Sequence, residues 1–270
     1  MTSHASVARG TLRFQLEQYY DAVPRSAARV EAVGPFSVFV GTGQWSYYAR
    51  PRLGLEHEFT VADIAAAAAR KRELGQPENF EWVHETTPSL LAAACAAGLD
   101  VLEAPLLVLD RSAWRMPEPP SGMTLRILEA GDPTLAAASA VQHVGFGAAG
   151  TAAGPQGVTE RDAATDDTGL DFLRERMRRG LTVTIVAEGE YGPAAAGQHQ
   201  PVEGVTEIVG VATLPAVRRQ GLGGAVTGAL VEDALERGVE TVFLSAGSDD
   251  IARVYSRLGF RRVGTACIVG

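Results

Sequence analysis

Lysine is almost absent from this chain of 270 residues. Lys71 is the only one, and the other strongly basic side chains are all arginine. Because alanine is abundant as well, we attribute this to coding bias rather than to function. Acidic residues outnumber basic ones, 32 to 24, which gives a formal net charge of −8. A negative chain is poorly suited to a phosphate backbone, so we expect no nucleic-acid partner.

Cysteine is also scarce. The two cysteines, Cys95 and Cys267, each lie in an apolar segment. Two isolated thiols make neither a disulfide scaffold nor a zinc site, and we expect both to be free and buried. The pair His84-Glu85 has no further ligand at a metal-binding spacing, so we expect no metal.

Long hydrophobic runs are missing too. The most apolar stretches are interrupted by charge or glycine well short of the ~20 residues that a membrane span needs. Residues 1–13 contain no apolar core of the signal-peptide type. Hydrophobic residues nevertheless make up 46% of the chain, which is ample core material. We therefore expect a soluble, cytoplasmic protein without a membrane partner.

Residues 112–122 hold three closely spaced prolines, which neither a helix nor a central strand accommodates. We interpret them as a linker between a first domain, residues 1–111, and a second, residues 123–270. We expect residues 146–169 and the connection at 189–206 to be loops. Periodicity and the placement of glycine and proline predict helices at 12–20, 61–74, 88–97, 134–144, 170–179, 225–237 and 249–258, and strands at 36–40, 80–84, 100–109, 124–128, 181–188, 207–214, 241–245 and 262–269.

The most informative segment is Arg218-Arg-Gln-Gly-Leu-Gly223, between the apolar run 208–214 and a helical pattern. Glycine lets the backbone approach a ligand and turn several N–H groups towards it. The helix adds unpaired N–H donors and the positive end of its dipole. Together these features predict a phosphate or pyrophosphate site. A P-loop is excluded because no Lys-Ser or Lys-Thr follows the glycines.

This segment resembles the pyrophosphate motif, Arg/Gln-x-x-Gly-x-Gly/Ala, of the GNAT (GCN5-related) N-acetyltransferases. One strand later, residues 249–260 resemble that family's segment with spaced Asn, Ala, Tyr and Gly-Phe positions. The resemblance covers residues 123–270 well and residues 36–110 as a degenerate second copy, as in bacterial tandem GNAT proteins. It implies an α/β chain of two GNAT-like domains, each with a mixed, mostly antiparallel twisted sheet flanked by helices. It also implies acetyl-CoA as co-substrate.

The resemblance assigns the donor site to one strand end and one loop. Backbone groups at Ala212, Thr213 and Leu214 would lie beside the pantetheine. Asp249 stands where the family often has Asn; an ionised Asp can only accept hydrogen bonds, so a role as helix N-cap is the alternative to a CoA contact. The residues expected around the pyrophosphate are Arg218, Arg219, Gln220, Gly221, Leu222, Gly223 and Gly224.

Two residues are assigned to catalysis. Tyr255 stands where the family has a tyrosine that faces the CoA sulfur, and a phenol can protonate the departing thiolate. A packing role is the alternative. Glu207, at the start of the strand that leads to the loop, is our candidate general base for the incoming ammonium. Glu188 on the adjacent strand and His143 are the other options.

The first domain lacks this chemistry. When Gly98 is aligned with Gly259, the two halves match as a repeat, and Ala94 falls where Tyr255 stands. Residues 54–60 carry acidic side chains and no Gly-x-Gly, and acids repel a pyrophosphate. We therefore expect one active site, in residues 123–270, that moves an acetyl or short acyl group to a small-molecule primary amine. The alternative is a non-catalytic acetyl-CoA sensor or partner-binding protein, and a homodimer is one option for its assembly.

Overall fold

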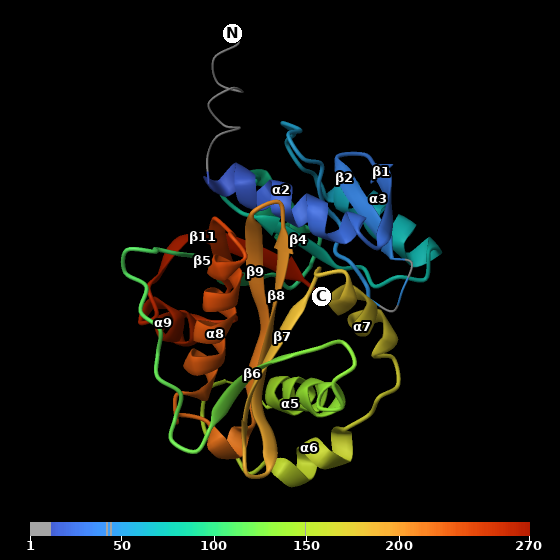
Figure 1. Cartoon of the computed structure of the whole chain (residues 1–270). Coiled ribbons are helices and arrows are strands. Elements are labelled where there is room, and N and C mark those ends of the chain that lie inside the picture. Colours follow the sequence, from blue (N-terminus) through green and yellow to red (C-terminus); the bar gives the residue numbers. More distant parts are fainter. Residues whose placement is uncertain (1–11, 42, 44, 149) are drawn as a thin grey trace. The chain divides into compact units, whose positions relative to one another are not determined.

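The computed structural model describes residues 12–41, 43, 45–148 and 150–270 (Figure 1). Residues 1–11, on which the expected absence of a signal peptide mainly rests, lie outside this part. The chain forms two compact units. The first contains the residues up to Leu106 together with 245–247 and 262–270, and the second contains 107–244 and 248–261. The two units are not divided at residues 112–122. The linker and the domain boundaries predicted there stay a prediction.

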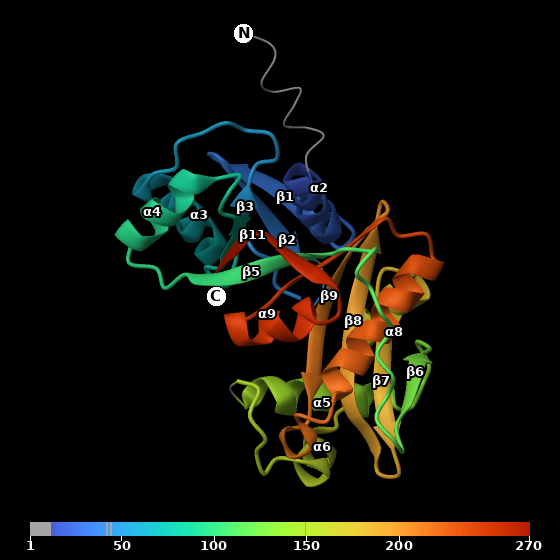
Figure 2. The same ribbon diagram turned by 90° about the vertical axis from the view of Figure 1, so that its left-hand side faces the viewer.

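The sheet of the second unit is mixed and mostly antiparallel, as expected. Its strands follow the order β10-β9-β8-β7-β6, and among these neighbours only β9 and β10 are paired in parallel. Figure 2 shows β9, β8, β7 and β6 next to one another. The strands are β6 (Thr124–Leu128), β7 (Val183–Gly189), β8 (Gly192–Val202), β9 (Val205–Thr213) and β10 (Thr241–Ser245). The predicted α/β class is therefore confirmed.

Helices cover both faces of this sheet. The space beside Ala212 is filled by Gly145 of α5, whereas the preceding residue, Val211, lies with Val226 of α8 around Gly197. Since neighbouring residues of a strand point to opposite faces, α5 and α8 lie on opposite sides. The helices are α5 (Leu135–Gly147), α6 (Val158–Ala164), α7 (Asp171–Arg178), α8 (Leu222–Glu236) and α9 (Asp249–Ser256), with a short 3-10 turn η1 (Pro215–Val217).

Strand β8 corrects the prediction of a polar connection at 189–206. Its sequence is rich in Gly and Ala and lacks the β-branched residues that usually mark a strand. The small side chains are needed because helices pack on both faces. A Cβ on Gly197 would lie 2.9 Å from Val226 and 3.0 Å from Leu230. Packing thus overrides local propensity at this central strand.

One other segment of the second unit differs from the prediction. The expected loop at 146–169 contains α6, which begins after Gly157, where Glu160 accepts a hydrogen bond from the Gly157 N–H at 2.6 Å. The predicted linker packs against α8, since a Cβ on Gly228 would lie 2.6 Å from Pro117.

The first unit contains two groups of strands. Strands β1 (Ala28–Val33), β2 (Phe36–Gly41) and β3 (Arg50–Pro51) form an antiparallel sheet, of which β1 and β3 were not predicted. A second group has the order β4-β11-β5. The last strand of the chain thus lies between two strands from its first half. The remaining bounds are β4 (Phe80–Val83), β5 (Leu102–Leu109), β11 (Phe260–Val269), α2 (Leu12–Arg25), α3 (Val61–Glu73) and α4 (Pro88–Ala96).

The core of the first unit includes Phe36, Phe80, Trp82 and Cys267, which are almost fully buried. Cys95 is exposed, so the expectation of two buried thiols is wrong for this residue. It lies on α4, whose buried side comprises other positions. None of the helices formed by the described residues has the length and apolar character that crossing a bilayer requires.

Candidate functional site

In the second unit, two neighbouring strands separate next to the glycine-rich loop. Strands β9 and β10 pair only from Val205–Thr241 to Glu207–Phe243. Beyond Glu207, β9 continues to Thr213 while β10 ends at Ser245. The edge of β9 that faces away from β8 is therefore not taken up by β10 over its last residues. Backbone groups on such an edge can pair with an extended ligand.

The loop after β9 has the conformation expected of an anion cradle. Arg219 and Gly221 have positive φ values, +67° and +90°, on either side of Gln220. Alternation of this kind turns successive N–H groups to one side of the chain. Helix α8 starts directly afterwards with Gly221 at its N-cap and no side-chain cap. Its first N–H groups are thus left for a ligand or solvent.

The predicted loop residues divide into two kinds. Arg219 and Gln220 are exposed, whereas Leu222 is buried, so Leu222 offers only its backbone. Gly223 lies beside the end of β9, since a Cβ there would be 3.6 Å from Thr213 Oγ1. Gly224 faces the other way, towards Leu258. The fold therefore brings the strand end and the helix start together.

Arg218 is committed to the protein itself. Its Nη2 donates to the carbonyl oxygens of Gly145 and Ala148, at 2.6 and 2.9 Å. Longer contacts join Nη1 to Ala152 O and Nε to Thr213 O, at 3.2 and 3.4 Å. The guanidinium thus donates hydrogen bonds to carbonyl oxygens at the C-terminal end of α5, where a positive charge is favourable. A direct contact of this side chain with phosphate stays a prediction.

The strand end offers fewer free groups than we expected. The Leu214 N–H donates to Ala194 O at 2.9 Å, and the Leu214 carbonyl accepts from Val217 N at 3.0 Å. Backbone groups alternate in direction along a strand, so Ala212, which pairs with Ala196, also faces β8, and Thr213 is the one of the three whose backbone faces the open edge. Backbone contacts of Ala212 and Leu214 with pantetheine stay predictions.

Tyr255 lies on α9 and is half-buried. Its ring packs edge-on against Phe260, with centroids 6.1 Å apart. Burial raises the pKa of Tyr255 to about 12, so the phenol stays protonated through mildly alkaline pH. Asp249 is the first residue of α9 and not its cap, because Ser248 caps the helix by accepting from Ile251 N at 3.3 Å.

The two candidate bases are in different situations. Glu207 lies opposite Phe243, at the last paired position before β9 and β10 part. Glu188 accepts hydrogen bonds from Arg126 Nε and Nη2, at 2.9 and 3.3 Å. A carboxylate held by a guanidinium is poorly placed to accept a substrate proton, which argues against Glu188. The role of Glu207 as the base stays a prediction. His143 is exposed on α5.

A bulge in β9 was missed by the sequence analysis. The β8–β9 register shifts so that Gly210 and Val211 together lie opposite Gly197. Gly210 has φ +64°, and its carbonyl accepts from Gln142 Nε2 at 2.8 Å. An isolated glycine within a strand pattern is the sequence signal that could have revealed the bulge.

A buried polar network was missed as well. His199 is fully buried, with Nδ1 3.0 Å from Thr206 Oγ1 and Nε2 2.8 Å from Asp233 Oδ2. Arg237 Nη2 donates to Asp233 Oδ1 at 3.0 Å. The network joins β8, β9 and α8, and its histidine has no access to solvent. We therefore assign it to stability.

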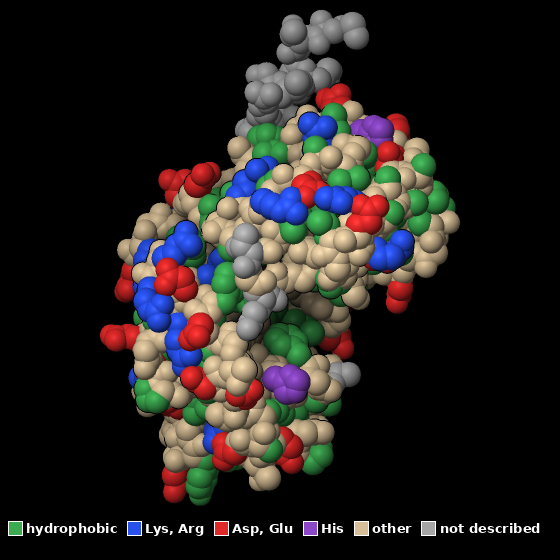
Figure 3. Space-filling model, turned by 90° about the vertical axis from the view of Figure 1, so that its right-hand side faces the viewer, with side chains coloured by type: hydrophobic (Ala, Val, Ile, Leu, Met, Phe, Trp, Pro, Cys, Tyr) green, Lys and Arg blue, Asp and Glu red, His purple; other side chains and the backbone are tan. Residues whose placement is uncertain are grey.

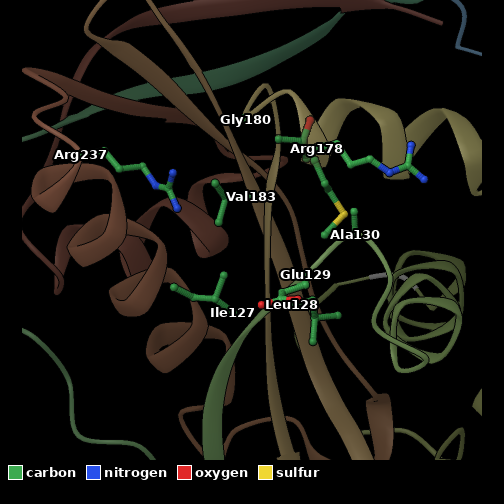
Figure 4. Close-up of a pocket in the computed structure, with 10 residues that line it drawn as sticks. Ile127, Leu128, Glu129, Ala130, Arg178, Gly180, Val183 and Arg237 are labelled. Carbon is green, nitrogen blue, oxygen red and sulfur yellow. The ribbon is translucent and has the colours of Figure 1, made fainter.

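A cavity of about 290 Å³ lies elsewhere in the second unit (Figure 4). Arg237 extends towards Val183, whereas Arg178 points away from the other lining residues. None of the predicted site residues lines this cavity. The lining residues are Ile127, Leu128, Glu129, Ala130, Met177, Arg178, Gly180, Thr182, Val183 and Arg237.

The described residues contain no group of three or more His, Cys, Asp or Glu side chains that could hold a metal ion. On the face seen in Figure 3, acidic and basic side chains are interspersed.

Comparisons with known proteins agree with the predicted resemblance. The family model described as FR47-like protein matches residues 182–269, which include β8, β9, the loop and α8. A GCN5-related N-acetyltransferase from Kribbella flavida is similar over 97% of this chain and 96% of its own, with 22% identity and a TM-score of 0.70. A tandem GNAT protein from the clavulanic acid biosynthesis pathway matches over 87% of this chain and 77% of its own, at 15% identity and a TM-score of 0.56. No curated protein matches.

Proposed function

We propose that this chain, whose fold is that of the GCN5-related N-acetyltransferases, transfers an acetyl or short acyl group from acetyl-CoA to a primary amine. The parting of β9 from β10 beyond Glu207, directly ahead of the α8 loop, carries the proposal. The open edge of β9 suits the amides of pantetheine, and the uncapped start of α8 suits the pyrophosphate. The open edge of β9 and the start of α8 follow one another along the proposed binding site of acetyl-CoA.

Glu207 has the role of general base in this proposal. The substrate arrives as an ammonium and becomes nucleophilic only after losing a proton, which Glu207 accepts directly or through a water molecule. The amine then forms the new C–N bond at the thioester carbonyl, and the C–S bond breaks. The second proton of the former ammonium leaves the nitrogen and goes to the departing sulfur, so the products are the amide and the neutral thiol of CoA. No covalent intermediate with the protein is needed.

Tyr255 has the role of stabilising the departing sulfur. Burial raises the pKa of Tyr255, so the phenol is protonated when the sulfur begins to carry negative charge. We therefore assign it a hydrogen bond to the sulfur as negative charge develops. Such a bond acts mainly in the transition state, where the charge is largest.

Calorimetry with acetyl-CoA, followed by a thiol-release screen over amines, amino acids, antibiotics and peptides, tests the function. Saturable binding and CoA release with at least one amine are expected. Binding without release on any amine would indicate the sensor instead. With a substrate in hand, Tyr255→Phe should lower kcat about 10²-fold, and Tyr191→Phe, at an exposed tyrosine, should not. An unchanged kcat for Tyr255→Phe would remove Tyr255 from the mechanism.

A further inference from the structure

The bulge of β9 lies where the strand has already parted from β10. Pairing with β10 ends at Glu207, and the bulge follows at Gly210 and Val211. From there to Thr213, the direction of the backbone groups is set by β8 and by the bulge. Side chains and backbone groups alternate along a strand, so one inserted residue reverses which groups face the open edge. The bulge therefore determines which backbone N–H and C=O groups β9 presents on its open edge, where the acetyl-CoA donor would bind.

A side chain from outside the sheet contacts this bulge. Gln142 of α5 donates from Nε2 to the Gly210 carbonyl oxygen at 2.8 Å. The contact needs a glycine, since a Cβ on Gly210 would lie 2.5 Å from the same nitrogen. One turn further along α5, a Cβ on Gly145 would lie 2.8 Å from the Ala212 Cβ. The helix thus rests on β9 at the bulge and just beyond it.

We propose that Gln142 is a positioning residue for the acyl-CoA donor. Its amide holds the Gly210 carbonyl towards α5, which fixes the bulge and with it the backbone groups of Val211 to Thr213 on the open edge. This inference rests on the function proposed above. Without the amide, the carbonyl is free to turn, and the edge loses its fixed pattern of donors and acceptors.

Calorimetry on the full chain tests the proposal with acetyl-CoA and with ADP. Gln142→Leu should weaken acetyl-CoA binding about tenfold and leave ADP binding within twofold, because ADP would contact only the loop at 219–224. A general loss of structure would weaken both. Gln18→Leu makes the same change at an exposed position of α2 and should alter neither affinity.

A second variant keeps the test sharp if Gln142→Leu folds poorly. Gln142→Glu has the same size, but its carboxylate cannot donate to a carbonyl. At pH 7.5 this variant should bind acetyl-CoA weakly. At pH 5, where the carboxyl gains a proton, its affinity should rise relative to the affinities of Gln142→Leu and of the wild type at the same pH. Unchanged acetyl-CoA affinity in both variants, or equal losses for acetyl-CoA and ADP, would overturn the proposal. A wild-type protein that fails to bind acetyl-CoA would instead overturn the proposed function.

Discussion

Replacing Arg218 by methionine should destabilise the protein, although the motif suggests a phosphate ligand. Hydrogen bonds from a charged donor contribute ~1.5–3 kcal/mol each. The contacts with Gly145 and Ala148 are short, whereas the two others exceed 3 Å. Counting the short pair at the lower figure, we expect a loss of about 3 kcal/mol in the free energy of unfolding. For a unit of this size that lowers Tm by roughly 6–12 °C.

The same substitution at Arg219 is the matched comparison. Arg219 is exposed and has φ +67°, a region that costs a side-chain-bearing residue ~1 kcal/mol relative to glycine. Arg219→Met should keep Tm and weaken acetyl-CoA binding about fivefold, more at low salt. Thermal unfolding and calorimetry separate the two residues. If Arg218→Met keeps its Tm and loses acetyl-CoA binding, the guanidinium serves the phosphates and our reasoning from its carbonyl contacts is wrong.

Three further outcomes follow from burial and packing. Gly145→Ala should lower the free energy of unfolding by ~1–3 kcal/mol in urea, and Gly147→Ala, with open space around it, should not. Burial raises the pKa of Asp233, but its histidine and arginine partners lower it to about 2; its stabilisation is therefore complete above an unfolded pKa near ~3.9 and lost as pH falls towards 2. Urea titrations should show Asp233→Asn less stable at pH 7, with a gap that shrinks below pH ~4, and a constant gap would contradict this. A thiol reagent should label Cys95 in the folded protein. It should reach Cys267, whose pKa burial raises to about 12, only in urea. Rapid labelling of both cysteines in the folded protein would contradict this.

The parts of the fold that sequence predicted well carry their information locally. Helix α3 begins after Thr60, whose side chain and that of Asp63 form a capping box, and its predicted range is nearly the observed one. Strand β10 coincides with its apolar run. Strand β8 has no such local signal, because its alanines and glycines are small to allow helices to pack on both faces of the sheet. Local patterns do not encode such packing.

The candidate site divides along the same line. The glycine loop could be predicted, since the positive φ of Gly221 follows from residue type, whereas that of Arg219 does not. The partners of Arg218 could not, because they belong to a helix end far away in the sequence. The role of Gln142 depends likewise on a bulge that only strand pairing defines. Sequence thus located the glycine-rich loop but not the contacts that hold it.

The position of β11 between β4 and β5 has a consequence for how the chain is made. A ribosome delivers the first unit's early residues first, yet that unit needs residues 262–270 to complete its strand order. At ~5–20 residues per second, the wait after Leu106 is on the order of 10–30 s. Through that interval β4 and β5 lack the strand between them, and unpaired edges invite aggregation. The first unit therefore cannot complete its strand order until the end of the chain has been synthesised, and a chain that ends before residue 262 would leave β4 and β5 without the strand between them.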